Sequence, residues 1–138
     1  MKSIKKSLIL SVVSLSIGGF IYVVTRPDTH ISLFADNILP IKELQNIFSF
    51  LNVDVIKYHI PDFLWAFSFT CAFLTIDQNF KRVCFFTSIC GILWEAMQFT
   101  HIVSGTGDFI DIIMYLTAVF IAVLINKKEC SDDEKEQN

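Results

Sequence analysis

Four long apolar blocks limit the folds open to this chain more than any other feature of its sequence. They cover residues 8–25, 60–76, 83–100 and 108–125, and each has about 17 or 18 residues. An α-helix rises about 1.5 Å per residue and the hydrocarbon layer of a bilayer is about 30 Å thick, so each block is close to the minimum length of a span. The pattern predicts an all-α integral membrane protein with four transmembrane helices in a small bundle.

The composition also favours a location in the membrane. Of the 138 residues, 53% are hydrophobic, which is more apolar surface than the core of one small water-soluble domain could bury. The formal net charge of -3 comes largely from acidic residues near the C-terminus, and nothing in the charge pattern suggests nucleic-acid binding. No two of the four cysteines form a CxxC pair. We therefore expect no disulfide, no metal site and no cofactor.

The distribution of lysine and arginine predicts the topology. If the N-terminus is cytoplasmic, three of these residues lie outside (Arg26, Lys42 and Lys57) and the other eight lie inside (Lys2, Lys5, Lys6, Lys81, Arg82, Lys127, Lys128 and Lys135). The positive-inside rule favours this arrangement in the cell membrane. An even number of spans returns residues 127–138 to the cytoplasm, where their composition predicts a disordered acidic tail after a transmembrane domain of residues 1–126.

The first apolar block follows three lysines and could be read as a signal peptide. Its length, and the lack of a convincing small-x-small cleavage site before Arg26, instead favour an uncleaved first helix.

A short amphipathic helix is predicted at residues 41–52, in the outer loop between the first two spans. Its apolar face would carry Ile41, Leu44, Ile47, Phe48 and Leu51, and its polar face Lys42, Glu43, Gln45 and Asn46. Pro40 suits the start of a helix. The segment either lies on the outer membrane surface or packs against the mouth of the bundle, and the pattern does not separate these two interpretations.

Three carboxylates fall inside the predicted spans at a similar depth. Glu95 follows about 18 Å of uncharged helix, and Asp62 and Asp111 each stand about 21 Å from the cytoplasmic ends of their helices. Charged groups are costly in hydrocarbon, and they normally face protein or water. The three residues therefore predict a polar pocket that opens outward.

Other polar residues extend this pocket. Gln98 and His101 follow Glu95 at intervals of one turn, and Asp108 and Tyr115 fall on the same helical stripe as Asp111. The candidate ligand-binding residues are Asp62, Glu95, Gln98, His101, Asp108, Asp111 and Tyr115. No residue stands out as a catalytic nucleophile.

Structural roles compete with binding at several of these positions. Asp62 and Asp108 sit where helices begin, so each can cap free N–H groups. Glu95 lies in the last third of its helix and gains nothing from an N-terminus, which favours a functional role over a buried neutral carboxyl. His59 and His101 fit interfacial polar residues better than metal ligands.

The segments WEAMQ and GTGDFIDIIMY resemble the VanZ-like membrane family. That family has an E-x-x-Q pair near the outer end of one helix, then a short loop and an Asp that opens the last helix, and Glu95, Gln98 and Asp111 match this pattern. The resemblance covers the second half of the chain. Because the family takes its name from a protein associated with teicoplanin resistance, it implies a role in the cell envelope and in antibiotic resistance.

These observations favour a multi-pass envelope protein whose outward pocket binds the head group of a lipid or an envelope precursor. One alternative is a membrane-embedded enzyme that uses Glu95 as general acid or base, assisted by His101 or His59. Another is a non-catalytic subunit whose carboxylates pair with a basic partner helix. The bilayer is the expected environment in each case, and an oligomer is compatible with all of them.

Overall fold

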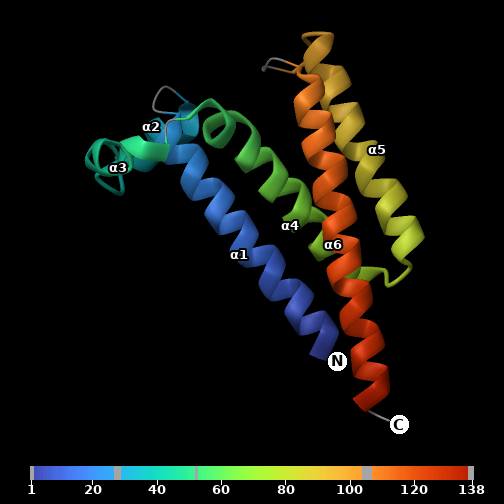
Figure 1. The fold of residues 1–138 in the computed structure, drawn as a ribbon. Helices are drawn as coiled ribbons and strands as arrows, with labels where there is room; N and C mark the ends of the chain where they lie inside the picture. Colours follow the sequence, from blue (N-terminus) through green and yellow to red (C-terminus); the bar gives the residue numbers. More distant parts are fainter. Residues whose placement is uncertain (1, 27–28, 52, 104–106, 137–138) are drawn as a thin grey trace.

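The computed structural model describes residues 2–26, 29–51, 53–103 and 107–136 (Figure 1). Within these ranges every regular element is a helix and there is no strand, which confirms the all-α prediction. The long helices are α1 (Lys2–Thr25), α4 (Ile60–Ile76), α5 (Phe80–Phe99) and α6 (Phe109–Glu136). The shorter elements are α2 (His30–Asp36), α3 (Ile41–Ile47), a 3-10 turn (Ser49–Leu51) and a π-helical turn (Val55–His59).

Among the described residues, three helical stretches are long and apolar enough to cross a membrane. They are Ile4–Thr25, Val55–Ile76 and Phe109–Lys128, and they contain most or all of the first, second and fourth apolar blocks. Helix α5 corresponds to the third block but is less apolar, because it carries Lys81 and Arg82 near its start and Glu95 near its end. The structure thus supports membrane localisation on the basis of three helices.

Helix α4 is the central element of the fold. It packs against α1 on one side and against α6 on the other, and it also contacts α5. Helices α5 and α6 run antiparallel beside each other, and the two ends of the chain lie at the same end of the molecule (Figure 1). We call the opposite end, where α4 and α6 begin, the far end.

Small residues let α1 approach α4 closely. Ser7, Ser11, Ser14 and Gly18 recur every three or four residues along α1, and the three serines are buried. The Ser68 hydroxyl on α4 donates to the Ser11 carbonyl oxygen at 2.8 Å. Small polar interfaces of this kind are typical of helices that associate within membranes.

A valine in place of Gly18 should destabilise this interface. An added Cβ would lie 3.0 Å from Trp65 Cδ1 and 3.1 Å from Leu64 Cβ, whereas at Gly19 it would meet nothing within 4 Å. We expect Gly18→Val to lower the free energy of unfolding by about 1–3 kcal/mol through overpacking. Gly19→Val is the matched control, because it makes the same change in the same helix. Equal melting of the two variants in detergent would contradict close α1–α4 packing.

The segment between α1 and α4 contains one helix more than the sequence predicted. Helix α2 begins after Thr29, whose side chain accepts a hydrogen bond from the Ser32 backbone N–H. The predicted helix at residues 41–52 is shorter in the structure, because α3 ends at Ile47 and a 3-10 turn follows it.

Helix α3 packs against the far end of α1. This agrees with the interpretation that the segment packs against the mouth of the bundle. The Phe48 ring, just after α3, meets the Phe20 ring edge to face at 5.3 Å. Two positions differ from the predicted faces. Gln45 donates to the Val23 carbonyl oxygen at 3.2 Å instead of facing solvent, and Ile47 is 66% exposed. The short helix is therefore rotated relative to the face that its apolar pattern suggested.

Helix α6 continues to Glu136, through most of the stretch for which the sequence predicted disorder. Residues 127–136 are rich in Lys and Glu, which are good helix formers, and they extend a helix that is already nucleated by its apolar part.

Candidate functional site

A cavity of about 480 Å³ lies on the face of α4 between α1 and α5, and α6 contributes one residue to its wall. Most of the wall is apolar or aromatic, and two tryptophans, Trp65 on α4 and Trp94 on α5, stand in it about 40% exposed (41% and 43%). The lining residues are Ser11, Leu15, Asp62, Trp65, Ala66, Ser68, Phe69, Ala72, Thr87, Cys90, Gly91, Trp94 and Tyr115. A largely apolar site with few polar groups suits an amphiphilic ligand.

Asp62 provides the only carboxyl group among the residues that line this cavity. It lies in the first turn of α4, directly after Pro61, so the start of the helix fixes its position. Its carboxylate makes no hydrogen bond or ion pair within the part of the chain that the structure describes, although Arg26 and His59 are close enough to act on it electrostatically. The capping role considered for Asp62 is therefore not seen, and its oxygens remain available to a ligand.

Tyr115 reaches the cavity from α6 because α5 and α6 approach closely at Gly91. A Cβ at Gly91 would lie 3.2 Å from the Cβ of Tyr115. The Tyr115 hydroxyl is hydrogen-bonded to the Glu95 carboxylate. Tyr115 thus connects the cavity to the buried Glu95.

Glu95 is 1% exposed and lies between α5 and the start of α6. Its Oε2 accepts a hydrogen bond from the Asp108 backbone N–H at 3.1 Å, directly before α6. The expectation that no helix N-terminus stabilises Glu95 is therefore wrong. The N-terminus of the neighbouring helix does so, because the turn after α5 brings α6 back beside it.

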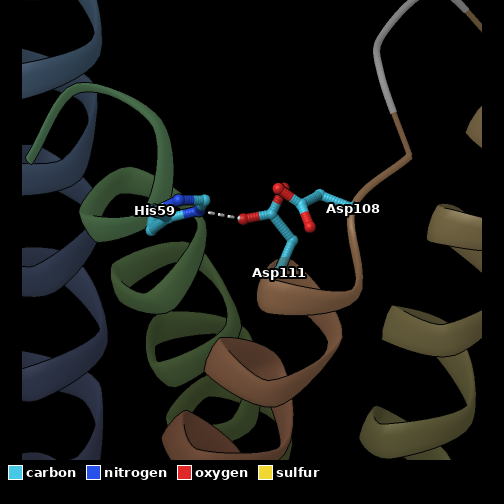
Figure 2. Close-up of side chains that lie close together, drawn as sticks. All are labelled: His59, Asp108 and Asp111. Carbon is cyan, nitrogen blue, oxygen red and sulfur yellow. Dashed lines mark hydrogen bonds and ion pairs between the residues drawn. The ribbon is translucent and has the colours of Figure 1, made fainter. Parts of the chain in front are cut away.

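His59, Asp108 and Asp111 form a polar cluster at the far end (Figure 2). His59 ends the π-helical turn before α4, and its Nδ1 lies 2.7 Å from Asp111 Oδ1 in the first turn of α6. Both side chains are largely buried, at 14% and 12% exposure. Asp108 lies beside them, and each residue offers a ligand atom within 4.8 Å of the others.

Asp108 also caps α6. Its Oδ1 accepts a hydrogen bond from the Ile110 backbone N–H at 3.0 Å, which confirms the capping interpretation of this residue. Its side chain nevertheless points toward Asp111 and His59 (Figure 2).

Gln98 and His101 lie outside both groups. Neither lines the cavity, and neither belongs to the cluster of described residues around Asp111. Helix α5 ends at Phe99, and His101 follows its cap in the left-handed region at φ 55°, where its side chain is exposed. The chain turns before His101, so counting further helical turns from Glu95 misplaces it.

Two residues beyond the predicted set help to build the site. His59 is brought to Asp111 by the packing of α4 on α6, and its place two residues before Pro61 was the only sequence signal for this. Arg26 donates through Nε and Nη2 to the carbonyl oxygens of Lys57 and Tyr58, both at 3.2 Å. It therefore fixes the π-helical turn that presents His59.

No protein-family model, curated protein or solved structure matches this chain.

Proposed function

We propose that this chain is a cell-membrane protein that binds an amphiphile, with the apolar chain in the α1–α4–α5 cavity and an amine or hydroxyl head group at Asp62. The observation that carries the proposal is a carboxylate without a hydrogen-bond partner among the described residues, set in a largely apolar wall. A half-buried carboxylate is costly unless a donor or a positive charge reaches it. An ammonium or hydroxyl head group supplies such a donor.

The proposal includes α5 as a fourth span, which places both chain ends in the cytoplasm. Helix α5 has 20 residues and is therefore about 30 Å long, enough to cross the hydrocarbon layer. Its embedded charge, Glu95, is buried against α6, while large apolar side chains are exposed along its outer surface: Phe85, Phe86, Ile89, Ile92 and Leu93. A helix that hides its carboxylate and exposes apolar side chains suits contact with lipid.

The resemblance to the VanZ-like family supports a role in the cell envelope. In that setting the ligand is a membrane lipid or a lipid-linked wall precursor. Of the residues in the shared pattern, none of Glu95, Gln98 and Asp111 lines the cavity. In this proposal Glu95 and Asp111 support the walls of the site, and Asp62 contacts the ligand directly.

The hydrogen bonds of Glu95 favour binding over the enzymatic alternative. A general acid or base must reach a substrate, and Glu95 is buried between the Asp108 N–H and the Tyr115 hydroxyl. Pairing of the carboxylates with a basic partner helix is the other alternative, and copurification of a protein after mild extraction would favour it.

Lipid retention tests the proposal, with the lipid added to delipidated protein and measured by native mass spectrometry. We expect phosphatidylethanolamine, whose cationic amine can pair with Asp62, to be retained better than phosphatidylglycerol, which offers hydroxyl groups but carries a net negative charge. Asp62→Asn should weaken that retention about tenfold or more, because a charge-assisted hydrogen bond contributes about 1.5–3 kcal/mol.

Two cysteines on α5 provide a matched pair for the apolar part of the cavity. Cys90 lines it and Cys84 does not, although both are half-buried. Cys90→Trp should fill the space and abolish retention, while Cys84→Trp should leave it intact. Equal retention by both tryptophan variants and by Asp62→Asn would rule out this site.

A further inference from the structure

We propose that His59, Asp108 and Asp111 bind a divalent transition-metal ion at the far end of the molecule. The inference is independent of the lipid proposal, because these three residues do not line the cavity.

The ligand set and its geometry suit such an ion. The three ligand atoms lie within 4.8 Å of one another and come from two segments, the turn before α4 and the start of α6 (Figure 2). Two ligands bound at about 2.0 Å to a tetrahedral ion stand about 3.3 Å apart. The His59–Asp111 pair at 2.7 Å needs to open slightly when a metal replaces the shared proton, and the widest pair needs to close by about 1–1.5 Å.

The buried carboxylate of Asp111 is suited to bind a cation. Asp111 is buried, and its only hydrogen-bond partner among the described residues is His59, within the cluster. Asp108 uses Oδ1 as a cap, and its Oδ2 makes no hydrogen bond within the same described ranges. Each aspartate thus has one oxygen to offer to a metal.

The charge around the cluster supports the same conclusion. Asp62 and Glu95 lie close enough to interact electrostatically with Asp111, so four carboxylates gather in this part of the molecule. The N-terminus of α6 contributes about half a positive charge, and Arg26 contributes one more. A divalent ion bound by two of the carboxylates offsets most of the negative charge that these groups leave.

The donor chemistry selects the class of ion. One imidazole nitrogen with two carboxylate oxygens suits Zn²⁺, Co²⁺ or Mn²⁺ better than Mg²⁺ or Ca²⁺, which prefer oxygen ligands alone. Three protein ligands leave at least one coordination position for water or another molecule.

Titration of the detergent-purified full chain with Co²⁺ and Zn²⁺, after treatment with a chelator, tests the site. We expect one ion per chain, a rise in melting temperature, and a Co²⁺ visible spectrum of nitrogen and oxygen ligands. His59→Ala and Asp111→Asn should each weaken binding at least about tenfold. His101→Ala is the matched control, because His101 is an exposed histidine outside the cluster, and it should bind as the wild type does.

Asp108→Asn keeps the test valid if the other variants fold poorly. Its amide oxygen can still cap α6, so the melting temperature without metal should stay near that of the wild type, while the affinity for Co²⁺ falls. Wild-type affinity in this folded variant would overturn the proposal. A thiolate charge-transfer band, which would assign the ion to cysteine, would overturn it too, as would the absence of Co²⁺ and Zn²⁺ binding by the wild type.

Discussion

Replacement of Glu95 by leucine should lower the free energy of unfolding by about 2–4 kcal/mol. Leucine fills most of the same volume but accepts no hydrogen bond, so the Asp108 N–H and the Tyr115 hydroxyl both lose their partner in a buried place. Each unsatisfied buried donor costs about 1–3 kcal/mol. Thermal unfolding in detergent measures the change, and the start of α6 should be the first region to lose protection from hydrogen exchange.

Two variants separate the hydrogen bonds from packing. Glu95→Gln keeps an acceptor oxygen of similar shape, so it should recover most of the stability, and Tyr115→Phe should remove only the second bond. A Glu95→Leu protein as stable as the wild type would show that Glu95 does not link α5 to α6. If that protein also retained lipid normally, Glu95 would have no role in supporting the site.

Cysteine labelling should give an all-or-none result for topology. In a chain whose native cysteines are replaced by alanine, a cysteine at Asp54 should react with an impermeant maleimide added to intact cells, whereas one at Asn79 should react only after permeabilisation. Asp54 lies just before the π-helical turn that leads into α4, and Asn79 lies in the turn between α4 and α5. The excess of lysine and arginine at the Asn79 end is the physical reason for this orientation.

The labelling also tests whether α5 crosses the membrane. A cysteine at Val103, just beyond α5, should react from outside in the same way as one at Asp54. Protection of Val103 together with labelling of Asp54 would leave three spans and exclude α5. Labelling of Asn79 from outside would reverse the orientation.

The long helices could be predicted from the sequence because apolar length alone determines them. The second apolar block and α4 have the same bounds, Ile60–Ile76, since Pro61 begins the helix and Asp77 follows its last apolar residue. Segments without that signal were predicted less well. Helix α2 has only seven residues, and the orientation of α3 depends on its contacts with α1 rather than on its own pattern.

The depth of the site residues in the membrane could be predicted from the sequence, but the contacts between them could not. The distance along each helix placed Asp62, Glu95 and Asp111 at one level, and the structure brings these three within electrostatic range of one another. The rotation of each helix about its own axis decides which side chains face one another. That rotation depends on packing against the other helices, so the sequence of one span does not determine it. For that reason His59 appeared to be an interfacial residue, and Gln98 was expected in a pocket that it does not line.

The central position of α4 has a consequence for biogenesis. Helix α1 is synthesised well before α4, its partner, since Ser11 and Ser68 are 57 positions apart. Until α4 is synthesised, the serine face of α1 contacts the insertion machinery or lipid. The contact between Ser7 and Asn126 spans 119 positions and forms last. We therefore expect assembly in two stages, an α1–α4 hairpin followed by docking of α6 with α5. A nascent chain stalled before α6 would leave the α6-facing side of α4, with Phe67 and Cys71, without the partner that covers it in the folded protein.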